Sequence, residues 1–207
     1  MSEELKLATA EERAESAQLA IEDDALVDAI LDQLECSSRV KRQRAAATIA
    51  LIAAQSPQSL GNAMSGIVAG LEQSEGQTRW ECLNALCNMV KADIMPSQDA
   101  LAAAEDALFD EDSGVVREAA FRFFCVYGAT SPAASDVVWS NLNEAIQCLH
   151  GNGEFNDMLT SLVAFAEGDI SKDTAAALSA RMKFDAENAH GTLRMRSEQI
   201  VAACAAK

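Results

Sequence analysis

The chain has 207 residues, a formal net charge of −16 and a hydrophobic fraction of 49%. So large an apolar fraction excludes an intrinsically disordered chain. The excess of acidic residues disfavours a protein that binds the phosphate backbone of nucleic acid. Aromatic residues make up only 5% of the chain. Apolar residues recur at helical spacing and nowhere alternate with polar residues over a strand length, so the sequence predicts an all-α protein.

Residues 1–21 are polar and acidic. Thr9 and Glu12 have the spacing of a capping box, and we expect a short helix here that is frayed at its start and caps the first repeat, with Leu19 and Ile21 docked on it. The stretch lacks the apolar segment of a signal peptide. We therefore expect a cytoplasmic protein in which the six cysteines are free and mostly buried. No apolar run reaches the length of a membrane span.

Helix pairs follow this stretch in chain order. The first helix of a pair carries an apolar stripe, as in Leu26, Ile30 and Leu34, and the second is apolar on most sides, as in AAATIALIAA. Prolines open three of the pairs: Pro57, Pro96 and Pro132. The pattern divides the chain into five predicted repeats: 22–55, 56–94, 95–130, 131–168 and 169–207.

The strongest signal is the period of these pairs. Equivalent positions near the start of the second helices lie 37 to 39 residues apart: Arg42, Arg79, Arg117, Phe155 and Arg194. The third residue after each is mostly small: Ala45, Cys82, Ala120, Met158 and Ser197. The seventh is large and apolar: Ile49, Leu86, Phe124, Leu162 and Val201. Such a period with helix–turn–helix content indicates a solenoid, in which stacking of the repeats completes the core.

The stretch DEDSGVVREAA, Asp110 to Ala120, resembles a HEAT repeat in its acidic turn, its Val-Arg pair opening the second helix and the small residues that follow. The match is close in the third predicted repeat, partial in the first two, and weakest in the fourth, where Phe155-Asn156 replaces Val-Arg. An armadillo-like three-helix unit is an alternative for individual repeats. The resemblance implies a right-handed α-solenoid of about five helix–turn–helix repeats, with the second helices lining its concave side.

Four arginines recur near the start of second helices: Arg42, Arg79, Arg117 and Arg194. One interpretation is a basic ladder for an acidic partner. The other, which we favour, is structural, because bidentate arginine–carboxylate pairs hold turns together. Each arginine would then pair with an acidic residue of its own or an adjacent turn, such as Asp110 or Asp112 for Arg117.

Two groups are candidate partner-binding residues. The first lies on the face of the second helices that we expect to be exposed: Trp80, Asn84, Glu118 and Arg122. An exposed tryptophan there would be an interaction hot spot, the alternative being that Trp80 packs against a neighbouring repeat. The second is the dense basic cluster Arg39, Lys41 and Arg44 beside Arg42, which could bind an acidic peptide or phosphate or could simply compensate the acidic helix before it.

No catalytic or metal-binding constellation stands out. Cys148 and His150 have no second pair at metal-ligand spacing, and the motifs of nucleotide-binding and hydrolytic enzymes are missing. We expect no cofactor and no metal, and a non-catalytic scaffold that binds another protein on the concave face of the second helices. The alternative is a helical-repeat enzyme or a protein handling nucleic acid or a chromophore, like DNA glycosylases or bilin lyases, which the net acidity and the missing constellation disfavour.

Overall fold

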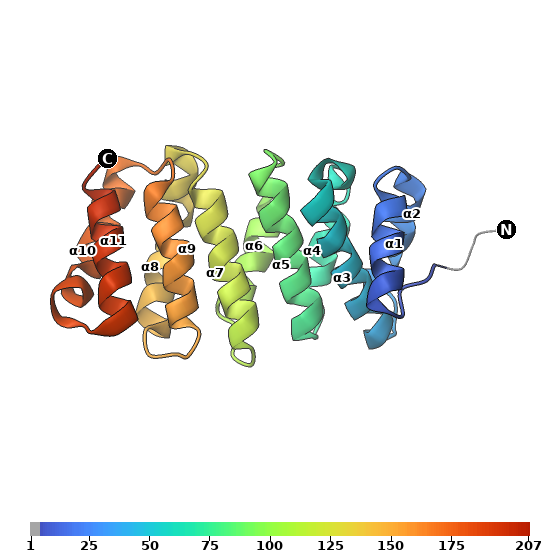
Figure 1. Cartoon of the computed structure of the whole chain (residues 1–207), viewed down its shortest axis with the longest axis horizontal. Coiled ribbons are helices and arrows are strands. Elements are labelled where there is room, and N and C mark those ends of the chain that lie inside the picture. The colour runs from blue at the N-terminus through green and yellow to red at the C-terminus, as the bar shows by residue number, and fades with distance from the viewer. Residues whose placement is uncertain (1–4) are drawn as a thin grey trace. The chain divides into compact units, whose positions relative to one another are not determined.

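A computed structural model describes residues 5–207 (Figure 1). Over these residues the chain forms eleven α-helices, two short 3₁₀ helices and no strand, which confirms the all-α prediction. The helices form two compact units, Met1–Ala107 and Leu108–Lys207.

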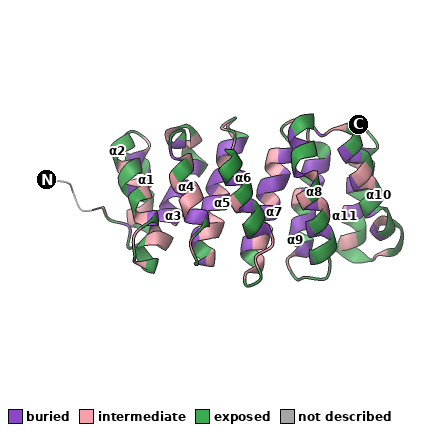
Figure 2. Cartoon of the chain, turned by 180° about the vertical axis from the view of Figure 1, so that it is seen from behind, coloured by how far each residue is buried: buried purple, intermediate pink, exposed green. Residues whose placement is uncertain are grey.

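The first unit holds six α-helices and both 3₁₀ helices: α1 Ala10–Ala20, α2 Asp24–Leu31, η1 Asp32–Leu34, α3 Arg39–Gln55, η2 Pro57–Leu60, α4 Met64–Leu71, α5 Gly76–Lys91 and α6 Gln98–Leu108, whose last residue belongs to the second unit. The helices α1, α3 and α5 lie side by side, with α2 packed on α3 and α4 on α5. Each of these α-helices carries buried residues, drawn in purple in Figure 2.

Helix α1 begins as the sequence predicts. Thr9 and Glu12 form both halves of a capping box, and the helix packs against α3. The expected docking of Leu19 is wrong, because this side chain is 64% exposed. Ala17 and Ala20 are buried instead, so small residues bring α1 close to its neighbours.

The second predicted repeat is interrupted where we expected one continuous first helix. The 3₁₀ helix η2 ends at Leu60, with Gly61 as its C-cap residue, and α4 starts only at Met64. Glycine and the following Asn62 favour a break, and the hydroxyl of Ser59 donates to the carbonyl of Ile21, which ties η2 to the end of α1. The helical segments η2, α4 and α5 thus form a three-part unit, the armadillo-like alternative.

The second unit holds α7 Gly114–Gly128, α8 Pro132–Leu149, α9 Phe155–Glu167, α10 Lys172–Asn188 and α11 Gly191–Cys204. Helix α9 packs between α7 and α11, while α8 contacts α7 and α10. The hydroxyls of Ser113, Ser131 and Ser171 cap the N-termini of α7, α8 and α10. Two helices per repeat, joined by short turns, make this unit HEAT-like.

The two predicted core columns are reproduced with one exception. The small third-position residues are buried in all five second helices, and the seventh-position residues are buried in four. Val201 in α11 is half-exposed, because α11 turns Ile200 and Cys204 into the core instead. The cysteines are free as expected; four are buried, Cys36 is half-buried and Cys148 is exposed.

Candidate functional site

An arginine is the fourth residue of α1 and of every second helix except α9. These residues are Arg13, Arg42, Arg79, Arg117 and Arg194. Arg13 was not among the predicted residues, although its distance of four residues from the capping residue Thr9 was a usable signal. At the fourth position a long side chain leans back over the N-terminal turn, since helical side chains point toward the N-terminus. The guanidinium can therefore reach the carbonyl groups of the preceding turn.

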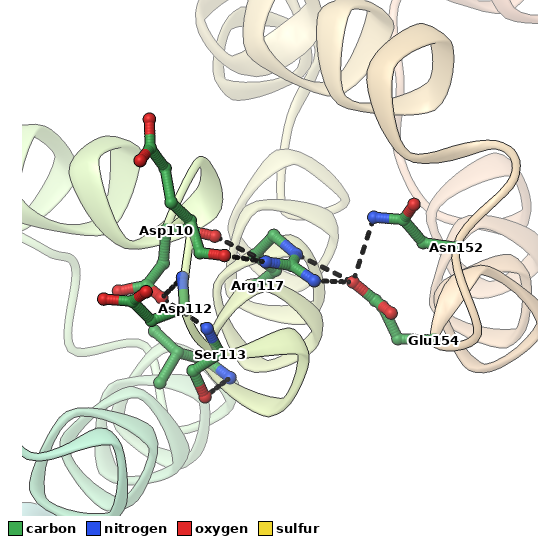
Figure 3. A network of polar contacts seen from close by, with 8 residues as sticks. Asp110, Asp112, Ser113, Arg117, Asn152 and Glu154 are labelled. Carbon is green, nitrogen blue, oxygen red and sulfur yellow. Dashed lines mark hydrogen bonds and ion pairs between the residues drawn. The ribbon is translucent and has the colours of Figure 1, made fainter.

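Arg117 illustrates the contacts that an arginine makes at the fourth position of a second helix (Figure 3). Its Nη1 donates to the backbone carbonyl of Asp110 at 2.6 Å. On the other side Nε lies 2.7 Å, and Nη2 2.6 Å, from Oε1 of Glu154, the N-cap residue of α9. Asn152 donates to the same oxygen at 3.4 Å. The guanidinium thus links its own turn to the turn that opens the next second helix.

We expected the carboxylates of Asp110 and Asp112 to pair with Arg117, but the structure shows a different arrangement. Oδ1 of Asp110 accepts the backbone N–H of Asp112 at 2.9 Å and that of Ser113 at 2.6 Å. Asp110 therefore closes the turn with its side chain and meets Arg117 through its carbonyl. The carboxylate of Asp110 stabilises the turn, and the charge that pairs with Arg117 comes from Glu154.

Arg42 repeats the arrangement in the first unit. Its Nη1 donates to the carbonyl of Cys36 at 2.6 Å, and its Nε donates to Glu75 at 3.1 Å. Nη2 also pairs with Glu75, the N-cap residue of α5. We call this arrangement, seen at Arg42 and Arg117, the arginine bridge: an arginine that bonds a carbonyl of its own turn and the N-cap glutamate of the next second helix.

The arginine bridge changes the electrostatics of both glutamates. The hydrogen bond from Arg42 lowers the pKa of Glu75, against the opposing effect of burial. Partial burial alone would raise the pKa of Glu154, but its own backbone N–H, Arg117 and Asn152 together hold it below the ordinary value. Donors that favour the charged carboxylate outweigh desolvation in both cases.

Two other arginines of the series, Arg13 and Arg194, make different contacts. Arg13 donates to the carbonyls of Leu7 and Ala8, both at 3.3 Å, and so ties down the segment before α1. Arg194 pairs with Glu198 on the exposed surface of its own helix at 2.8 Å. Arg79 is half-buried.

The candidate partner-binding residues fall into two pairs. Trp80 and Asn84 lie one turn apart on α5 of the first unit, and both are half-buried rather than fully exposed. Asn84 Nδ2 is 3.5 Å from a carboxylate oxygen of Glu81. In the second unit Arg122 forms an ion pair with Glu118 at 3.3 Å on α7. The structure thus places a tryptophan and an asparagine one turn apart on α5, and an ion pair on α7.

Within the predicted basic cluster, the neighbouring Arg42 is engaged in the arginine bridge. Arg39 and Lys41 are exposed at the start of α3, Arg44 is half-buried, and Arg42 is bound to Glu75. Val40 lies exposed between them. The two fully exposed cations form a small positive patch on the first turn of α3.

The side chain of His150 contacts residues of two other helices. Its Nε2 lies 3.0 Å from Oδ2 of Asp185, and its ring packs 4.9 Å from the ring of Phe155. It therefore joins the end of α8 to α10. Among residues 5–207 no three His, Cys, Asp or Glu side chains are placed to hold a metal ion. None of the helices described is both long and apolar enough to cross a membrane.

Comparison with solved structures identifies the fold. Computationally designed armadillo repeat proteins for modular peptide recognition superpose with a TM-score of 0.66 and 15% identity, over 93% of this chain and 92% of theirs. A designed armadillo repeat protein in complex with the peptide (KR)4 also gives 0.66, at 16% identity over 94% and 92%. The archaeal HEAT-like repeat protein from Thermococcus onnurineus NA1 gives 0.52, at 14% identity over 94% and 93%.

No family model matches the sequence, and no curated protein matches it. The structural matches cover nearly the whole chain, so the expected α-solenoid of HEAT- and armadillo-like repeats is confirmed. At these identities the likeness establishes the fold: the chain is built from HEAT/armadillo-like helical repeats.

Proposed function

We propose that the protein is a non-catalytic interaction scaffold that binds a segment of another protein along its second helices. The observation that carries the proposal is the pair Trp80 and Asn84, side by side on α5 and both partly accessible. The indole offers a large rigid contact area of the kind that dominates interaction energies. The carboxamide both donates and accepts hydrogen bonds, so it can pair with the N–H and C=O groups of an extended chain.

Two further observations support this proposal. Beside α5 lies α3, whose positions equivalent to Trp80 and Asn84 are Gln43 and Ala47, both partly accessible. A small residue next to an aromatic one leaves room for a bound chain. Designed proteins of the same fold were built for modular peptide recognition, and one is known in complex with (KR)4. Proteins with this fold can therefore bind peptides.

The test is loss of partners on removing the pair. Trp80→Ala/Asn84→Ala and the unchanged protein would be used as bait in lysate of the native host, with bound proteins identified by mass spectrometry. The chain supplies a matched control: Phe184 and Asn188 are also an aromatic residue and an asparagine one turn apart, on α10, and both are exposed.

We expect the Trp80 and Asn84 variant to lose specific partners that the Phe184→Ala/Asn188→Ala variant keeps. Circular dichroism at 222 nm checks that both variants stay folded. The same partners in all three samples would refute this surface.

A further inference from the structure

A groove with acidic walls opens on the first helices of the first unit. Two adjoining cavities, of about 630 and 580 Å³, share Val68, Glu72 and Asp99. Together they run between α4 and α6, and we call them the acidic groove. Small and apolar side chains form much of its lining: Met64, Val68, Ala69, Leu71, Ala102 and Ala103. The small alanines leave the space that larger residues would fill.

The charges around the acidic groove are mostly of one sign. Three carboxylates line it, Glu72, Asp99 and Asp106, and all three residues are exposed to solvent. Arg79 is the one cationic residue of the lining. A cleft lined by one sign of charge focuses the field and attracts ligands of the opposite sign. The net charge of −16 adds long-range attraction for the same ligands.

We propose that the acidic groove docks an extended, lysine- or arginine-bearing segment of a partner protein. Asp99 and Asp106 are seven residues apart on α6, which places their Cα atoms about 10.5 Å apart along the helix axis. Cations three residues apart in a polyproline II chain lie on the same face of that chain at a similar spacing, about 9 Å. Their aliphatic stems can lie on the apolar lining while their heads reach the carboxylates.

The acidic groove is separate from the surface of the proposed function. Its carboxylates lie on α6 and at the end of α4, and although Arg79 of α5 also lines it, neither Trp80 nor Asn84 does. The two surfaces can therefore be tested independently with substitutions in the same chain. Binding at one does not require binding at the other.

The experiment measures binding of a fluorescein-labelled octapeptide of alternating lysine and arginine to the full chain by fluorescence anisotropy. Asp99→Asn/Asp106→Asn removes two charges from the acidic groove. The control Asp28→Asn/Asp32→Asn removes the same charge from exposed positions of the first repeat. We expect the dissociation constant to rise about fivefold to tenfold for the groove variant and less than about twofold for the control.

A second variant blocks the groove without removing a carboxylate. Ala102 is an exposed helical residue of the lining, so Ala102→Arg keeps the helix intact while placing a cation in the groove. We expect it to abolish peptide binding, whereas Trp80→Ala/Asn84→Ala leaves binding unchanged.

Three results would overturn the inference. Equal losses in the groove variant and the Asp28/Asp32 control would mean attraction by net charge alone. Loss only in the Trp80/Asn84 variant would place the peptide on the second helices. Full binding by Ala102→Arg would show that the groove is not occupied.

Discussion

Arg117 Nη2 and Glu154 Oε1 meet at 2.6 Å, and this contact joins the first turn of α7 to the N-cap of α9. Both side chains are largely shielded from water, with exposed fractions of 15% and 16%. Arg42 and Glu75 make the equivalent contact between α3 and α5. In each unit an arginine bridge therefore connects two consecutive second helices, so a specific ion pair supports the stacking of repeats in addition to apolar packing.

The first prediction concerns the arginine bridge itself. Arg117→Met keeps most of the aliphatic stem but removes the donors to Asp110 and Glu154, so it should lower the free energy of unfolding by about 1–3 kcal/mol. Arg194→Met is the control, because Arg194 pairs with Glu198 on an exposed surface and should cost about 0.5 kcal/mol or less. Urea unfolding followed by circular dichroism measures both. Equal effects would show that Arg117 is no more than a surface ion pair.

The second prediction is a pH dependence from Glu154. Its folded pKa lies below the ordinary value of 4.5, so the folded state binds fewer protons than the unfolded state. The stabilisation is therefore complete above the unfolded pKa and is lost as pH falls through the folded pKa. The difference in unfolding free energy between the wild type and Glu154→Gln, about 1–2 kcal/mol at pH 7, should stay constant down to about pH 5.5 and then shrink.

Comparing the two proteins removes the effect of the other carboxylates, since these are the same in both. Urea unfolding at a series of pH values between 3 and 7 gives the curve. A difference that grows on acidification would contradict the assignment of Arg117 as the partner that keeps Glu154 charged.

The sequence contained the period and the local signals of this fold. Helix starts could be located from Thr9, Ser131 and Pro132 because caps depend on neighbouring residues only. The core columns could be predicted because helical spacing decides which side chains share a face. Both kinds of signal depend on residues close in sequence, so they can be recognised without knowing how the repeats stack.

The partners of the arginines could not be predicted in the same way. Glu75 lies four residues before Arg79, but Glu154 lies directly before Phe155, so the two glutamates have no common offset in the repeat. They become equivalent only as N-cap residues, once neighbouring second helices are packed together. The acidic groove was missed for a related reason: it depends on the space left between α4 and α6.

The third prediction tests close packing at Gly128. A Cβ atom there would lie 2.5 Å from Cγ2 of Val138 and 2.7 Å from a ring carbon of Phe165. Gly128→Ala should therefore lower the free energy of unfolding by about 1–3 kcal/mol, the usual effect of overpacking. A Cβ at Gly153 would meet nothing within 4 Å, so Gly153→Ala is the matched control and should not destabilise. Thermal unfolding of both variants measures the effect. An unchanged Tm for Gly128→Ala would refute the close packing of α7, α8 and α9 at this glycine.

The fourth prediction is a gain of stability at the end of α5. Asp93 has φ +63°, in the left-handed region. Its N–H bonds the carbonyl of Val90, and the N–H of Ile94 bonds that of Met89, both at 3.0 Å, which is the Schellman pattern of a helix C-terminus. Glycine adopts this conformation without steric cost, whereas other L-residues incur about 1–2 kcal/mol, partly offset by the greater chain entropy of glycine.

Asp93→Gly should therefore raise the free energy of unfolding by about 0.5–1 kcal/mol. Asp93→Ala removes the same charge but keeps a Cβ atom, so it should give no gain. Urea unfolding of the two variants beside the wild type separates backbone strain from charge. Equal stabilisation by both substitutions would mean that relief of negative charge in this acidic chain, and not the left-handed backbone, is the cause.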